Sequence, residues 1–116
     1  MNTIYLIGLM GVGKTSSGRM LSNLTNKSFI DLDSEIEKAS GLTVANFFKK
    51  RGESSFRLFE SKLLKSFSKS IISCGGGVVL SSSNREFLKE NGKVILLTAS
   101  LHEIEKRLAK TNTRPL

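Results

Sequence analysis

The chain has 116 residues and a mass of 12.7 kDa, which is enough for one domain and too little for two independent hydrophobic cores. Hydrophobic residues make up 39% and charged residues 24%, with a single proline, so the composition excludes disordered and collagen-like proteins. Lys and Arg total 18 against 10 Asp and Glu, a formal charge of +8. We therefore expect the protein to attract anions.

The basic residues are dispersed, and the longest uninterrupted run is 49–51. Aromatic residues are only 7% of the chain and mostly fall at helical core spacing, so we expect no nucleic-acid partner. The first apolar stretch is broken by Gly8 and lacks a basic start, which predicts neither a signal peptide nor a membrane span. Cys74 is the single cysteine and cannot form an internal disulfide. A cytoplasmic location is the resulting expectation.

Four short apolar runs predict β-strands at residues 4–7, 29–30, 71–72 and 94–97. Helical patterns separate them, and the strands do not alternate apolar with polar residues. Parallel strands buried on both faces have this character. The sequence therefore predicts an α/β fold with three layers, a parallel sheet covered by helices on both faces.

Helix signals lie between these runs. Thr43 is expected to cap a helix that ends before Gly52, and a second helix is expected at about residues 53–68. Its apolar stripe leaves Arg57 and Glu60 one turn apart to one side. Residues 100–103 form a capping box ahead of a last helical segment, where we assign the lone His102 no role beyond capping and solvation.

Residues 8–15 carry the most specific chemical signal, a G-x-x-x-x-G-K-T sequence between the first strand and the first helix. Its glycines let backbone N–H groups converge on phosphate oxygens, beside the positive end of a helix that begins near Lys14. Lys14 is then expected to reach the β- and γ-phosphates, and the Thr15 hydroxyl to ligate Mg²⁺. This pattern predicts binding of a nucleoside triphosphate and does not by itself name a reaction.

Three weaker signals follow. Asp31 and Asp33 end the second strand, where α/β sheets place their ligands, so they can serve Mg²⁺ and an acceptor hydroxyl; the alternative is that one of them only caps the next helix. The glycine run 75–77 permits positive φ and a close ligand, or is a plain flexible turn. Arg57 can form a fork to a carboxylate, or is a surface arginine paired with Glu60.

Five segments resemble one family in their order and spacing, and together they extend over the whole chain. They are residues 8–15, Asp31-Leu32-Asp33, Gly52-Glu53 with Phe56-Arg57, the glycine run and residues 113–116. The chain is similar to the shikimate kinases, small P-loop kinases of the nucleoside-monophosphate-kinase fold. Gluconate and adenylate kinases share only the first motif.

The resemblance implies transfer of the γ-phosphoryl group of ATP, with Mg²⁺, to the 3-hydroxyl of shikimate, in the synthesis of chorismate and aromatic amino acids. It implies catalytic roles for Lys14, Asp33 and Arg114, metal ligation by Thr15 and Asp31, and shikimate contacts from Asp33, Arg57 and Gly76. The implied ATP contacts are Gly11, Val12, Gly13, Lys14, Thr15, Ser16, Arg107 and Arg114.

Members of the family continue past an Arg-Pro-Leu motif through the rest of a lid, a further helix, a fifth strand and a final helix. We accordingly expect residues 1–108 to be the kinase core, residues 109–116 to begin the lid, and the chain to be a monomeric, truncated form with reduced activity. The strand at 94–97 is expected to be an exposed edge. The alternatives are a kinase completed by a partner chain, a non-catalytic nucleotide-binding protein, and another small-metabolite kinase such as a gluconate kinase.

Overall fold

Four parallel strands form the centre of the structure, a computed structural model that describes residues 3–8 and 14–97. They are β1 (Ile4–Ile7), β2 (Phe29–Asp31), β3 (Ile71–Ser73) and β4 (Lys93–Leu96), arranged in the order β2-β3-β1-β4. Each lies within one residue of its predicted position at either end. In the described part of the chain β4 has β1 as its only neighbour, and Leu96 on it is 64% exposed. The expectation of an exposed edge strand is met there.

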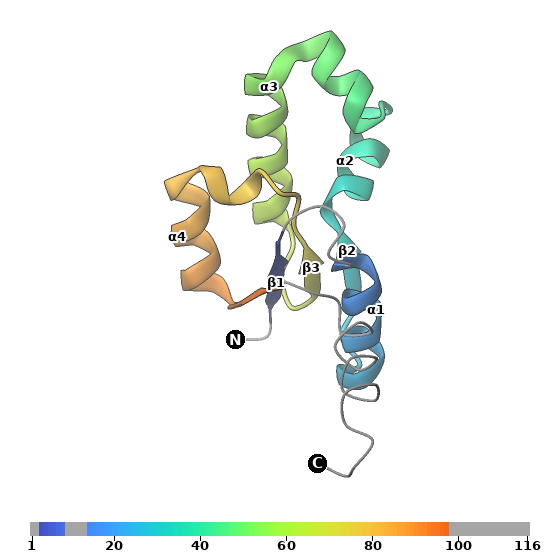
Figure 1. Cartoon of the computed structure of the whole chain (residues 1–116), viewed down its shortest axis with the longest axis vertical. Helices are drawn as coiled ribbons and strands as arrows, with labels where there is room; N and C mark the ends of the chain where they lie inside the picture. The colour runs from blue at the N-terminus through green and yellow to red at the C-terminus, as the bar shows by residue number, and fades with distance from the viewer. Residues whose placement is uncertain (1–2, 9–13, 98–116) are drawn as a thin grey trace, which may run out of the picture.

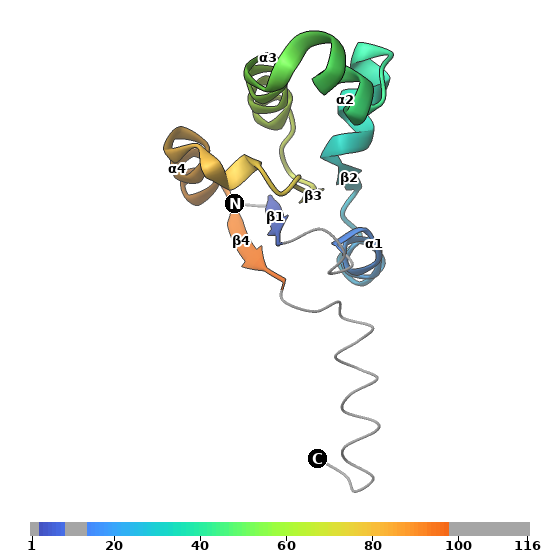
Figure 2. The same ribbon diagram turned by 45° about the horizontal axis from the view of Figure 1, so that its top comes forward.

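Helices connect these strands, as parallel pairing requires. They are α1 (Lys14–Thr25), α2 (Leu32–Ser40), α3 (Val44–Ser66) and α4 (Ser82–Asn91), with a short 3₁₀ helix, η1 (Val78–Leu80), before α4. In Figure 1, α2 and α3 arch over one end of the sheet, while α1 and α4 lie on opposite sides of it. Figure 2 shows the same arrangement with the arch turned toward the viewer.

The two faces of the sheet carry separate cores because neighbouring residues on a strand point in opposite directions. Tyr5 of β1 and Ile72 of β3, which are register partners, pack with α3 and α4. Leu6 and Ile71 face the other way and pack against Leu21 of α1. The predicted α/β architecture, with a parallel sheet covered on both faces, is confirmed.

Helix α3 is broken at Gly52, whose backbone has φ 82° and ψ 167°. That conformation strains any residue with a Cβ, and no described atom lies where a Cβ would go. The Thr43 side chain caps the first half by accepting a hydrogen bond from the backbone N–H of Asn46. Both the cap and the interruption agree with the sequence prediction. No helix in residues 3–8 and 14–97 is long and apolar enough to cross a membrane.

Candidate active site

Lys14 and Thr15 open α1, directly after the predicted phosphate-binding loop. The Lys14 ammonium donates a hydrogen bond of 2.9 Å to the backbone carbonyl of Gly8, at the end of β1. Thr15 and Ser16 are exposed on the first turn. Both ends of the loop are therefore seen, whereas Gly11, Val12 and Gly13 lie outside the described residues.

Asp31 joins β2 to α2 and uses its two carboxylate oxygens differently. Oδ1 accepts hydrogen bonds from the backbone N–H groups of Asp33 (3.1 Å) and Ser34 (3.4 Å), which caps α2. Oδ2 accepts a hydrogen bond of 3.3 Å from the Thr15 hydroxyl. Asp31 is thus the residue that caps α2, as the alternative interpretation expected, and its second carboxylate oxygen contacts Thr15 at the start of α1.

Thr15 and Asp31 suit a magnesium ion by the chemistry of their donors. A hydroxyl and a carboxylate are hard oxygen ligands, and Mg²⁺ keeps several waters and takes substrate phosphates rather than an all-protein cage. Within the described ranges, no group of three or more His, Cys, Asp and Glu side chains is placed to hold a metal ion. A magnesium ion at this position would have to be carried mainly by phosphate and water.

Asp33 lies in the first turn of α2 and faces the turn after β3, where its Oδ1 comes within 3.0 Å of the position a Cβ on Gly75 would take. Burial raises the pKa of Asp33, and the neighbouring Asp31 carboxylate raises it further. Lys14 and Arg57 act in the opposite direction and lower that pKa. The carboxyl group of Asp33 is therefore subject to the positive charge of side chains from two different helices.

Arg57 is held on α3 by aromatic rings and by one strong ion pair. Its guanidinium lies 5.6 Å from the centre of the Phe48 ring and 5.2 Å from that of Phe56. Nη1 donates a hydrogen bond of 3.0 Å to Glu60 Oε1, and a weaker contact of 3.8 Å joins Nε to Glu53. The Nε atom is buried without a hydrogen-bond partner in the described structure. The expected pairing with Glu60 is present, but Arg57 is 32% exposed and is not a fully solvated surface residue.

Glu60 departs from the expectation that it lies to one side of the apolar stripe. It is 1% exposed and follows Phe56 by one turn on the buried face of α3. Burial raises the pKa of Glu60, while the hydrogen bond from Arg57 lowers it. An acidic side chain is tolerated in this core because the guanidinium pairs with it. The spacing of three residues between Arg57 and Glu60 was the signal for this pair, but the pattern could not show its burial.

The glycine run after β3 serves close packing rather than positive φ. Among the described glycines with positive φ are Gly8, Gly41 and Gly52, and none of residues 75–77. A Cβ on Gly77 would lie 2.1 Å from Arg57 Nη1, and one on Gly75 would touch both Asp33 and Glu60 at 3.0 Å. Gly76 is exposed at the tip, with open space around it. The glycine run permits positive φ but does not adopt it, and what approaches the backbone here is the protein's own side chains.

These residues gather at the carboxyl ends of β1, β2 and β3, the edge of the sheet where α/β proteins bind ligands. A cleft of about 230 Å³ lies beside Arg57 and is lined also by Gly77 and Asn84. Arg107, Arg114, His102, the capping box at 100–103 and the lid expected at 109–116 lie outside the described residues.

A parallel sheet whose first strand leads through G-x-x-x-x-G-K-T into a helix defines a P-loop nucleotide-binding protein. A family model described as shikimate kinase matches residues 10–116. The chain belongs to the shikimate kinase family.

Curated relatives and solved structures agree with this assignment. The chain is 42% identical to the shikimate kinase of Thermodesulfovibrio yellowstonii, over all of this chain and 69% of that protein. It is 41% identical to that of Nitrosospira multiformis, over 97% of this chain and 60% of the relative. The structure of shikimate kinase from Acinetobacter baumannii in complex with shikimate matches with a TM-score of 0.80 and 39% identity, over all of this chain and 66% of that one. The structure of shikimate kinase from Aquifex aeolicus matches with a TM-score of 0.79 and 35% identity, over 88% of this chain and 62% of that one. The chain thus spans 60–69% of the length of these four proteins.

Proposed function

We propose that this chain is the part of a shikimate kinase that holds the ATP phosphates and the acceptor, and that the reaction moves the γ-phosphoryl group of ATP to the 3-hydroxyl of shikimate. The observation that carries this proposal is that Asp33 and Arg57 both lie against the glycine turn at one end of the sheet. A Cβ on Gly75 would lie 3.0 Å from Asp33 Oδ1 and one on Gly77 2.1 Å from Arg57 Nη1, and Lys14 lowers the pKa of Asp33. A carboxylate and a guanidinium beside a phosphate-binding lysine are what a hydroxylated acid needs in order to receive a phosphoryl group.

On the donor side, Lys14 neutralises the β- and γ-phosphates, exchanging the Gly8 carbonyl for phosphate oxygens. Thr15 and Asp31 hold Mg²⁺, which supplies charge stabilisation to the phosphates when it is bound. Gly11, Val12, Gly13 and Ser16 complete the ATP contacts. Arg107 on the adenine side and Arg114 over the phosphates are proposed from the family resemblance alone.

On the acceptor side, Asp33 orients the attacking hydroxyl and accepts its proton. The pKa of Asp33, raised by burial, brings its basicity closer to what proton transfer at neutral pH requires. Lys14 and Arg57 act against this increase and lower the pKa of Asp33.

Arg57 holds the substrate carboxylate. Glu60 fixes one nitrogen of the guanidinium at 3.0 Å, and the rings of Phe48 and Phe56 restrict its plane. The remaining N–H groups of this partly exposed guanidinium are then available for a bidentate contact. The backbone of Gly76 contacts the ring hydroxyls at the exposed tip of the glycine turn.

The wider setting follows from the same reaction. ATP and shikimate are the proposed partners, Mg²⁺ is the cofactor, and the product feeds the synthesis of chorismate and aromatic amino acids in the cytoplasm of a cell. We propose a monomer without nucleic-acid or membrane partners.

The test is a titration of the purified chain with ATP and Mg²⁺, followed by an assay of shikimate-dependent ADP release. Lys14→Ala should abolish ATP binding, whereas Lys89→Ala on the exposed face of α4 should leave it unchanged. Arg57→Lys should weaken shikimate binding far more than ATP binding, because an ammonium cannot reproduce the two-pronged contact. ATP binding without shikimate-dependent turnover would instead favour a non-catalytic nucleotide-binding protein. Turnover with gluconate in place of shikimate would reassign the acceptor.

A further inference from the structure

Asn84 is a buried polar side chain in the first turn of α4 that joins two other elements. It is 3% exposed. Its Nδ2 atom donates a hydrogen bond of 3.0 Å to the Ser61 hydroxyl on α3 and one of 3.1 Å to the backbone carbonyl of Val78 in η1. A side-chain amide nitrogen carries two hydrogens, so both are used. One side chain of α4 therefore connects α3 to the start of η1.

The glycine turn, residues 75–77, and η1 form one hydrogen-bonded unit. The backbone N–H of Val78 donates to the carbonyl of Gly75 at 3.2 Å, and that of Leu80 donates to the carbonyl of Gly77 at 3.1 Å. Glycines have no side chain to anchor them, so the position of the turn depends on these backbone contacts. Val78 is held by its side chain, which is buried in the core, and by the bond from Asn84 to its carbonyl. Whatever fixes Val78 therefore fixes the turn.

The two hydrogen bonds of Asn84 lie beside the contact between the turn and Arg57. Ser61 follows Arg57 by one helical turn on α3. Val78 directly follows Gly77, where an added Cβ would lie 2.1 Å from Arg57 Nη1. The cleft of about 230 Å³ is lined by Arg57, Ser61, Gly77 and Asn84 among others. Asn84 therefore ties the helix that carries Arg57 to the turn that packs against its guanidinium.

The amide group is what this position requires. Leucine has a similar branched shape and no donor, and an ionised aspartate only accepts hydrogen bonds. Loss of the amide leaves the Val78 carbonyl and the Ser61 hydroxyl without this donor, at a cost in free energy. The start of η1 then has to shift to regain a partner, and the glycine turn moves with it relative to Arg57.

We propose that Asn84 is a positioning residue of the acceptor site, which holds the glycine turn in the place against α3 that Arg57 needs in order to bind a substrate carboxylate. Asn84 does not contact the substrate and acts through the turn and through α3. Its effect on shikimate rests on the function proposed above, whereas its hold on the turn does not.

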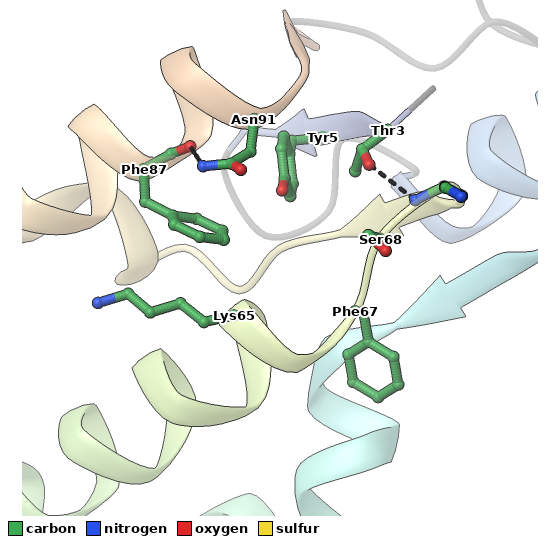
Figure 3. A pocket seen from close by; sticks show the side chains of 8 residues that line it. Thr3, Tyr5, Lys65, Phe67, Ser68, Phe87 and Asn91 are labelled. Carbon is green, nitrogen blue, oxygen red and sulfur yellow. Dashed lines mark hydrogen bonds between the residues drawn. The ribbon is translucent and has the colours of Figure 1, made fainter. Parts of the chain in front are cut away.

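Asn91 provides a matched control on the same helix. Figure 3 shows it on the last turn of α4, where its amide donates to the backbone carbonyl of Phe87 at 2.8 Å. Asn84→Leu and Asn91→Leu each remove one amide from α4 without adding charge. Calorimetry should show shikimate binding weakened about fivefold in Asn84→Leu, the equivalent of one neutral hydrogen bond, and ATP binding within about twofold. Asn91→Leu should leave both affinities within about twofold of the unaltered chain.

Ser61→Ala tests the link to α3, because it removes one acceptor and keeps the bond from Asn84 to Val78. It should also weaken shikimate binding more than ATP binding. Added to Asn84→Leu it should change shikimate affinity by less than about twofold, because both substitutions break the same hydrogen bond. Since Asn84 and its packing stay in place, Ser61→Ala tests the proposal even if Asn84→Leu does not fold.

Amide hydrogen exchange separates positioning from a general loss of stability. In Asn84→Leu the amides of Val78 and Leu80, which bond within the turn, should exchange at least about fivefold faster relative to that of Cys74, which bonds to the sheet. Equal acceleration of all three amides, unchanged shikimate affinity in Asn84→Leu, or the same loss of affinity in Asn91→Leu would overturn the proposal. An unaltered chain that binds ATP and not shikimate would refute the proposed function instead, and the exchange of Val78 and Leu80 would then decide the role of Asn84.

Discussion

Replacing Gly77 by alanine tests how Arg57 is held. The backbone of Gly77 has φ −88° and ψ −7°, which alanine adopts without strain, so the added methyl group acts only through contact. Its Cβ would lie 2.1 Å from Nη1, 2.2 Å from Cζ and 2.5 Å from Nη2 of Arg57. The guanidinium has to retreat by about 1.3 Å to reach an ordinary contact of 3.4 Å.

That movement lengthens the hydrogen bond of 3.0 Å between Arg57 and Glu60 beyond useful range. A hydrogen bond to a charged group contributes about 1.5–3 kcal/mol, and the lower end applies because Arg57 is 32% exposed. Alanine offsets about 0.5 kcal/mol of this loss by restricting the unfolded chain. We expect the free energy of unfolding to fall by about 1 kcal/mol and the melting temperature to fall by about 4 °C.

The same displacement should raise the KM for shikimate at least about tenfold, because the anchor for its carboxylate is moved. Gly76→Ala is the matched control for stability, since no atom lies within 4 Å of its added Cβ. It should change the free energy of unfolding by less than about 0.5 kcal/mol. Thermal melting and ADP-release kinetics measure both effects. Equal melting temperatures for the two variants, or a KM for shikimate in Gly77→Ala equal to that of the unaltered chain, would refute this account of Arg57.

Three other substitutions separate folding from chemistry. Asp31→Ala should cost about 1 kcal/mol by removing the α2 cap, while Asp31→Ser should keep the cap and lose Mg²⁺-dependent ATP binding; equal thermal stability in both variants would contradict the capping role. Burial raises the pKa of Asp33 in the folded state, so as the pH rises the unfolded chain loses the carboxyl proton of Asp33 before the folded chain does. The free energy of unfolding therefore falls as the pH rises from the ordinary to the raised pKa. Asp33→Asn should therefore stabilise the chain at neutral pH but not below about pH 4, and it should abolish turnover. A stability gain that is the same at both pH values would count against a raised pKa for Asp33. Burial raises the pKa of Cys74 to about 12, so its thiol should react with iodoacetamide at pH 8 only after denaturation, and rapid labelling of the folded chain would disprove its burial.

The parts of the fold that depend on local pattern were predictable. The strands are short and apolar, Thr43 is a good helix cap, and Gly52 interrupts a helical pattern. Helix α4 was expected only as one of the helices between strands, without bounds or a cap, although Ser81 caps it by accepting a hydrogen bond from the backbone N–H of Asn84 at 3.3 Å. Residues 81–83 are three consecutive serines. Serine favours both turns and helix caps, so composition alone does not separate the two.

The site was predictable in its residue types and not in its packing. The order of the motifs indicated Lys14, Asp33 and Arg57, but whether a polar residue in a helix is buried depends on a partner that periodicity does not reveal. Glu60 is such a residue, because its burial depends on the Arg57 guanidinium. The glycine run has the same kind of explanation, since its close contacts come from side chains on α2 and α3. Sequence distance conceals contacts between separate elements.

The place of β1 in the sheet has a consequence for how the site can change over time. This strand leads into the phosphate-binding loop and has neighbours on both sides, whereas β2, which leads into α2, pairs with β3 alone among the described strands. Amide hydrogens of a doubly flanked strand are expected to exchange last, and those of an edge strand and its attached arch earlier. The proposed donor half of the site is therefore attached to the part of the molecule that is expected to open most slowly. We therefore expect substitutions in the arch of α2 and α3 to alter the choice of acceptor while the proposed ATP site is preserved.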